Sequence, residues 1–109
     1  MNRILILVGA GLFLGCGTDA GPAMPIEPAA LYNQMCTRCH GQDGQGNAEL
    51  MKTMPIKSFA DPEVRPRLRT DDIERIIMTG KNQMPSFGAQ LSGPKIQAVA
   101  GHVKRLGLK

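Results

Sequence analysis

The chain has 109 residues and a formal net charge of +4, from 13 basic and 9 acidic side chains, and only 4% of its residues are aromatic. This length accommodates one small domain, and so small and scattered a charge excess argues against a nucleic-acid-binding protein. A small domain with few large side chains buries little apolar area, so we expect a disulfide, a metal or a cofactor to stabilise it.

The N-terminal residues 1–15 predict a signal peptide. Arg3 supplies a positive charge, and residues 4–14 form an uncharged apolar run. That run is shorter than the roughly 20 residues that span a bilayer, and it has the length of the apolar region of a signal peptide. We therefore expect an exported protein; the alternative is a buried N-terminal helix.

The end of the apolar run, Phe13-Leu14-Gly15-Cys16, resembles a bacterial lipoprotein cleavage box, although Phe13 stands where that box usually carries Leu. The resemblance implies that Cys16 is acylated and anchors the protein to a membrane. Residues 16–27 are rich in Gly, Pro and small side chains, without periodicity, and read as a flexible tether. The folded domain would then span residues 28–109. If the box is not used, an ordinary signal peptidase still removes a similar segment.

Three helices are expected along the domain. The first runs from about Ala29 to Cys36, with Pro28 suited to a helix start. A glycine-rich segment, residues 41–47, then interrupts regular structure. The second begins at Thr70 as N-cap and ends before Gly80. The third begins at Ser92 as N-cap and ends at Gly107, and its inward-facing residues are Ile96, Val99, Ala100, Val103 and Leu106.

The stretch Cys36-Thr37-Arg38-Cys39-His40 has the C-x-x-C-H spacing. A redox dithiol usually opens a helix, whereas this pair follows one. A zinc site needs two further ligands, and only Cys16 and His102 remain as candidates. Covalent haem attachment needs what is present, namely two thiols for the vinyl groups and an imidazole for the iron. Haem is therefore favoured, with the dithiol and zinc readings as alternatives.

A haem of this kind commonly takes a methionine as its second axial ligand. Met84 lies in the segment GKNQMPSFG, where Pro85 stiffens the chain next to the sulfur. Met54 also precedes a proline, but it follows His40 by 14 residues whereas Met84 follows it by 44. The longer connection gives the chain room to pass around the haem edge, so Met84 is favoured over Met54.

The motifs CTRCHG and QMPSFG, within residues 28–108, resemble those of a class I monohaem c-type cytochrome of the bacterial type. The resemblance implies a small all-α fold, with about three to five helices around one covalently bound haem c. It implies thioether bonds at Cys36 and Cys39 and axial iron ligands at His40 and Met84. It also implies one-electron transfer rather than enzymatic catalysis.

Several expectations follow from the resemblance and from departures in this sequence. Tyr32 takes the place of an aromatic residue at the crossing of the first and last helices, and His102 stands where its usual aromatic partner would be. The carbonyl of Pro55 is expected to accept the free ring N–H of the His40 imidazole. The haem propionates are expected to meet basic side chains, with Lys57, Arg67 and Arg69 as candidates.

The function expected is electron shuttling between membrane-associated redox partners outside the cytoplasm, in the periplasm or cell envelope, through transient encounters. One alternative is a haem sensor or ligand-binding protein whose Met84 ligand is displaceable. Another is a haem subunit of a larger redox enzyme.

Overall fold

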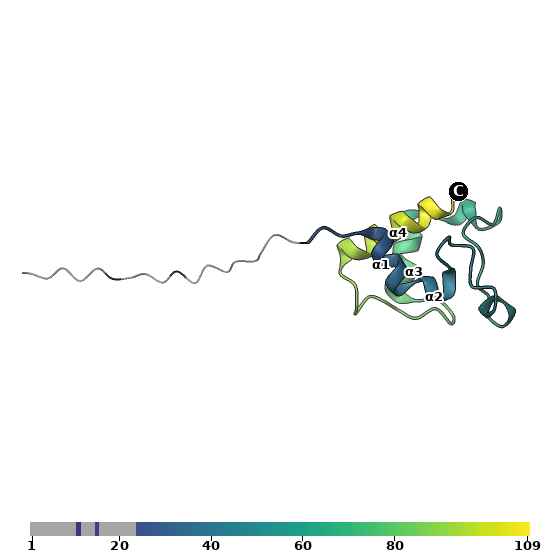
Figure 1. Cartoon of the computed structure of the whole chain (residues 1–109), viewed down its shortest axis with the longest axis horizontal. Coiled ribbons are helices and arrows are strands. Elements are labelled where there is room, and N and C mark those ends of the chain that lie inside the picture. The colour runs from purple at the N-terminus through teal and green to yellow at the C-terminus, as the bar shows by residue number, and fades with distance from the viewer. Residues whose placement is uncertain (1–10, 12–14, 16–23) are drawn as a thin grey trace, which may run out of the picture.

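The computed structural model describes residues 11, 15 and 24–109 of the chain (Figure 1). The predicted signal peptide, apart from Gly11 and Gly15, lies outside the described residues, as do Cys16 and the tether up to residue 23. None of the helices in the described part of the chain is long and apolar enough to cross a membrane.

The described residues form an all-α fold, as predicted. Its regular elements, in chain order, are α1 (Pro28–Met35), α2 (Thr37–His40), the 3₁₀ turns η1 (Leu50–Lys52) and η2 (Arg65–Arg67), α3 (Thr70–Thr79) and α4 (Gly93–Leu106). The β-type pairing within residues 24–109 is limited to one isolated bridge between Lys81 and Met84. In Figure 1, α1, α3 and α4 gather together, while the irregular chain between α2 and α3 extends to one side.

The first helix begins at Pro28, one residue earlier than expected, because a proline is well suited to the first turn, where a missing N–H costs nothing. It ends when the Cys36 N–H donates to the Tyr32 carbonyl at 2.8 Å. Cys36 itself leaves the helical conformation (φ −122°, ψ −28°), and a new short helix, α2, starts at Thr37. The cysteine pair therefore follows α1, as predicted, but it also stands at the start of a second helix, which the sequence did not indicate.

The core is formed where α4 packs against both α1 and α3. All five residues predicted to face inward from α4 are buried, and Tyr32 and Val99 are fully enclosed. Ile73 and Ile77 of α3 are buried, whereas Ile76 of the same helix is only half-buried. Leu91 completes the buried set from the turn that leads into α4. The amphipathic pattern of α4 thus indicated the face of that helix that packs.

Of the two predicted N-caps, the one at Ser92 is confirmed and the one at Thr70 is wrong. Ser92 is the N-cap of α4, yet its side chain makes no capping hydrogen bond. Thr70 is the first residue of α3 rather than its N-cap, and Arg69 precedes it without a capping bond. Asp71 and Asp72 lie in the first turn of α3, where carboxylates interact favourably with the helix dipole.

Candidate functional site

Two half-buried thiols lie at the break between α1 and α2. The Cys36 carbonyl accepts hydrogen bonds from the N–H groups of Cys39 (3.2 Å) and His40 (3.0 Å), which places both cysteines within a single helical turn. Neither thiol is part of a disulfide. Burial, together with the neighbouring Cys39, raises the pKa of Cys36 to about 11 from its ordinary value of 9.0. The Cys36 side chain is therefore a neutral thiol at physiological pH.

The side chain of His40 is half-buried, but its Nδ1 atom is buried and has no hydrogen-bond partner among the described residues. Burial lowers the pKa of His40, so the ring is neutral at physiological pH, which is the form that binds a metal. A buried polar atom without a partner is destabilising, by about 1–3 kcal/mol, unless a further group satisfies the ring.

The expected hydrogen bond from His40 to the Pro55 carbonyl is absent from the described structure, so that prediction was wrong. An aromatic residue lies against the imidazole instead: the ring of Phe59 stacks on it, with centroids 4.9 Å apart and planes inclined by 24°. Phe59 is held by its own N–H, which donates to the Gly44 carbonyl at 2.9 Å. The chain thus covers the face of the imidazole without offering an acceptor to its edge.

The residues around the C-x-x-C-H stretch hold it in place. Gly41 follows His40 with φ 73° and ψ 158°, a conformation that favours glycine, and its carbonyl accepts the Tyr32 hydroxyl at 2.7 Å. The Gly46 N–H donates to the His40 carbonyl at 2.7 Å, and the Asn47 N–H donates to the Cys39 carbonyl at 2.9 Å. The last carbonyls of α2 are therefore satisfied by the glycine-rich segment, which explains why that segment follows so closely.

Met84 lies in the connection between α3 and α4. Its side chain is half-buried and packs against the core. By contrast, Met51 and Met78 are 40% and 49% exposed, and Met54 is half-buried without joining the core cluster. Among these four candidate thioethers, only that of Met84 combines contact with the core and a neighbouring proline.

The side chains present fit a covalently attached haem. Two thiols lie in the same helical turn as a neutral imidazole that lacks a partner for one nitrogen, and a thioether in a proline-stiffened segment packs against the core. No group of three or more His, Cys, Asp or Glu side chains within the described residues is arranged to hold a metal ion. His102 lies instead against Tyr32, with ring centroids 4.9 Å apart and planes inclined by 51°.

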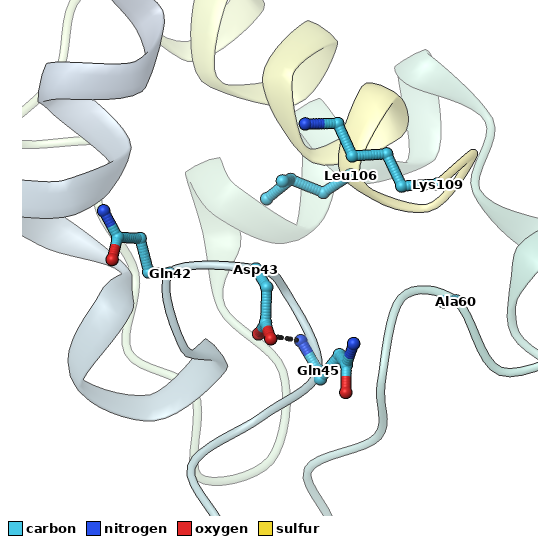
Figure 2. A pocket seen from close by; sticks show the side chains of 6 residues that line it. All are labelled: Gln42, Asp43, Gln45, Ala60, Leu106 and Lys109. Atoms are coloured by element: carbon cyan, nitrogen blue, oxygen red, sulfur yellow. Dashed lines mark hydrogen bonds between the residues drawn. The ribbon is translucent and has the colours of Figure 1, made fainter.

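A surface cavity is lined by other residues (Figure 2). It has a volume of about 580 Å³ and is lined by Gln42, Asp43, Gln45, Ala60, Leu106 and Lys109. It contains none of the four candidate haem-binding residues. The Asp43 carboxylate accepts the Gln45 N–H at 3.0 Å, so this carboxylate serves the turn that follows Gly41. The cavity is an open surface feature of that turn and the end of α4.

The basic side chains considered for the propionates are exposed. Lys57 lies 3.9 Å from the Glu63 carboxylate, and Arg69 lies 3.4 Å from that of Asp71. Such exposed pairs contribute little to stability, on the order of 0–1 kcal/mol, so they leave both cations able to exchange partners. Their role at the propionates stays a prediction.

Most of the chain is similar to known proteins. Residues 23–103 match the family described as cytochrome C oxidase, cbb3-type, subunit III. A cytochrome c6 from Synechococcus sp. is 32% identical over 100 residues, which cover 92% of this chain and 86% of the relative. A cytochrome c6 from Gracilaria tenuistipitata var. liui is 33% identical over 76 residues, which cover 67% of this chain and 64% of that relative, so the chain spans slightly less than two thirds of its length.

A solved structure supports the same assignment. The KustC0563 c-type cytochrome superposes with a TM-score of 0.68 at 28% identity, covering 74% of this chain and 98% of the other. The all-α arrangement of α1, α3 and α4 is therefore that of a small c-type cytochrome. The chain belongs to the c-type cytochrome family matched over residues 23–103, whose cofactor is covalently bound haem c.

Proposed function

We propose that this protein is a one-electron carrier in which Cys36 and Cys39 hold the haem through thioether bonds and His40 and Met84 ligate its iron. The observation that carries the proposal is the buried, unpartnered Nδ1 atom of the His40 imidazole, which lies in the same helical turn as the two thiols. When bound, the haem supplies an iron that alternates between the ferric and ferrous states.

The chain's own residues hold the ligands and keep water away from them. α2 and the segment after it fix the backbone of His40, and Phe59 covers the face of its imidazole. The buried side chains of the described residues are all hydrophobic, with no buried charge among them. An apolar environment disfavours the additional charge of ferric haem, and a methionine ligand favours the ferrous state, so both raise the reduction potential.

We further propose that the protein works outside the cytoplasm, attached to a membrane. The proposal is supported by the sequence of residues 1–15, which read as a signal peptide, and by the lipoprotein-like box that ends at Cys16. Residues 16–27 would form the tether and residues 28–109 the cytochrome domain. Exposed basic side chains such as Lys52, Lys81 and Lys95 would favour brief encounters with acidic redox partners.

The test of haem attachment is direct. Full-length protein made with a cytochrome maturation system should give a pyridine haemochrome spectrum of haem c, and its intact mass should include one haem and the acyl groups on Cys16. The Cys36→Ala/Cys39→Ala variant should lose the haem, and Cys16→Ser should lose only the acyl groups. Colourless wild-type protein would refute the proposal.

The test of the second ligand uses a matched pair of variants. Met84→Ala should abolish the far-red absorption band of a methionine–ferric iron bond, whereas Met54→Ala, which alters the rival Met-Pro pair, should keep it. A wild-type protein that lacks this band and binds carbon monoxide readily would instead be a haem sensor or ligand-binding protein.

The family description favours one second candidate function, that of a haem subunit docked to a larger redox enzyme. A free carrier should elute from a size-exclusion column at the size of the monomer in detergent, and a docked subunit should elute with its partners. The experiment requires a detergent extract of the native membrane, since overproduced protein would lack stoichiometric partners.

A further inference from the structure

The segment that carries Met84 folds back on itself immediately after α3. Lys81 and Met84 exchange two backbone hydrogen bonds, of 3.1 and 2.9 Å, across a two-residue turn. Asn82, the first residue of that turn, has φ 53°, which asparagine tolerates better than most residues. Residues 80–88, here called the Met84 loop, are therefore an ordered hairpin-like connection.

Three further hydrogen bonds join residues 86–88 of the Met84 loop to the last turn of α3. Two come from backbone groups: the Phe87 N–H donates to the Ile77 carbonyl at 2.9 Å, and the Gly88 N–H donates to the Met78 carbonyl at 3.1 Å. The third comes from a side chain, because the Ser86 hydroxyl donates to the Met78 carbonyl at 2.5 Å. Ser86 is thus the one residue of the described loop whose side chain makes this connection to α3.

The loop lies close against itself and against α3. A Cβ atom added at Gly80 would lie 2.6 Å from the Met84 carbonyl oxygen, and one added at Gly88 would lie 2.8 Å from the Met78 carbonyl oxygen. Such approaches leave no room for side chains between the backbone segments. Because the segments are in contact, a shift at Ser86 is transmitted to its neighbours rather than absorbed by empty space.

Only Pro85 separates Ser86 from Met84. The proline ring fixes φ near −65°, so the chain between the two residues has little freedom. Holding Ser86 on the Met78 carbonyl therefore restricts where the backbone of Met84 can lie. The backbone bonds of Phe87 and Gly88 act one and two residues farther from Met84 and restrict it less directly.

We propose that Ser86 is a positioning residue for Met84: its hydroxyl fastens the Met84 loop to the end of α3 and so resists displacement of the thioether from the haem iron. The inference rests on the proposed function, in which Met84 is an axial ligand. When an external ligand such as imidazole binds the oxidised protein, the sulfur–iron bond breaks and a nitrogen–iron bond forms, with no net electron transfer. Loosening the loop favours that exchange.

The experiment compares three variants of the full-length, haem-loaded protein. Ser86→Ala removes the hydroxyl, and Ser86→Thr keeps one. Thr79→Ala is the matched control, because the Thr79 hydroxyl donates to the Arg75 carbonyl at 2.8 Å and, at 3.3 Å, to the carbonyl of Gly80, the first residue of the loop. It makes no bond to residues 81–88, which include Met84 and Ser86. The readout is the rate at which imidazole abolishes the far-red band of the oxidised protein, measured by stopped flow at several imidazole concentrations.

A single hydrogen bond at an exposed position is worth about 0.5–1.5 kcal/mol, which corresponds to a change of about two- to tenfold in rate. Ser86→Ala should therefore exchange its ligand about two- to tenfold faster than wild type, Thr79→Ala should stay at the wild-type rate, and Ser86→Thr should restore a slow rate. Denaturant unfolding of the two alanine variants distinguishes positioning of Met84 from a general contribution to stability. A merely structural role would lower the unfolding free energy without changing the exchange rate.

An unchanged exchange rate in Ser86→Ala, or an equal acceleration in Thr79→Ala, would overturn the inference while leaving Met84 as a ligand. A wild-type protein without the far-red band, or a Met84→Ala variant that keeps it, would overturn the ligand assignment itself and with it the role of Ser86. The two failures are therefore distinguishable in one set of samples.

Discussion

Replacing Gly44 by alanine should destabilise the domain and disturb the imidazole of His40. Gly44 is buried and has φ 77°, a conformation that side chains of L-amino acids rarely adopt. A Cβ atom at this position would lie 2.7 Å from Cδ2 of Phe59 and 3.2 Å from Cβ of Leu106. The ring of Phe59 would have to move, and this is the ring that stacks on His40.

The expected loss of stability has two parts. The left-handed backbone conformation costs a non-glycine residue about 1–2 kcal/mol. Overpacking against Phe59 and Leu106 adds about 1–3 kcal/mol. Alanine also restricts the unfolded chain more than glycine does, which raises the unfolding free energy by about 0.4–1 kcal/mol. The net change in unfolding free energy should thus be a loss of about 3 kcal/mol.

The control is the same chemical change at Gly101, inside α4. There a Cβ atom would meet only the tip of the Arg105 side chain, at 3.4 Å, and alanine favours the helix by about 1 kcal/mol. Guanidinium unfolding of both haem-loaded variants, followed by far-ultraviolet circular dichroism, should show Gly44→Ala less stable and Gly101→Ala more stable than wild type. If the unfolding free energy of Gly44→Ala lies within about 0.5 kcal/mol of the wild-type value, the close approach of Gly44 to Phe59 does not exclude a side chain at position 44, and the reasoning is refuted.

Three further changes test the core and the helix crossing. Val99→Ala, at a fully buried position of α4, should lower the unfolding free energy by about 2 kcal/mol through lost apolar burial and a residual cavity, as denaturant unfolding would show. Tyr32→Phe leaves the Gly41 carbonyl without its hydroxyl donor and should cost about 1 kcal/mol in the same assay; no change would mean that water replaces the bond. Burial and the charges of Arg105 and Lys109 lower the pKa of His102, so its contribution to stability is full above its ordinary pKa of 6.5 and is lost as the pH falls through its lowered value. His102→Gln should therefore show a smaller loss of stability between pH 7 and pH 5 than wild type, and an equal loss would contradict this account.

The sequence predicted the helices well because their signals are local. Pro28 marks the start of α1, and the spacing of Ile96, Val99 and Val103 marks the buried face of α4, both confirmed by the structure. Periodicity of apolar residues and helix-start residues act over a few positions, so they can be read from a single sequence.

The surroundings of His40 could not be read in the same way. Phe59 follows His40 by 19 residues in irregular chain, where no periodicity indicates which side chain faces which. The expectation for the Pro55 carbonyl came from resemblance, and in the described structure the Nδ1 atom of His40 has no hydrogen-bond partner. The hydroxyl of Tyr32 was also missed, since its acceptor, Gly41, becomes a neighbour only after α1 ends and α2 turns the chain back.

The meeting of α1 with α4 has a consequence for the order of assembly. Tyr32 lies in the first helix of the domain and becomes enclosed only when residues of α4 pack against it. In the sequence, α4 begins more than 50 positions after His40. A chain that crosses a membrane from its N-terminal end would present Cys36 and Cys39 while α4 is still on the other side. Before α4 has crossed, the thiols would be accessible to a maturation enzyme. Packing of α4 against α1 would then complete the fold and restrict that access.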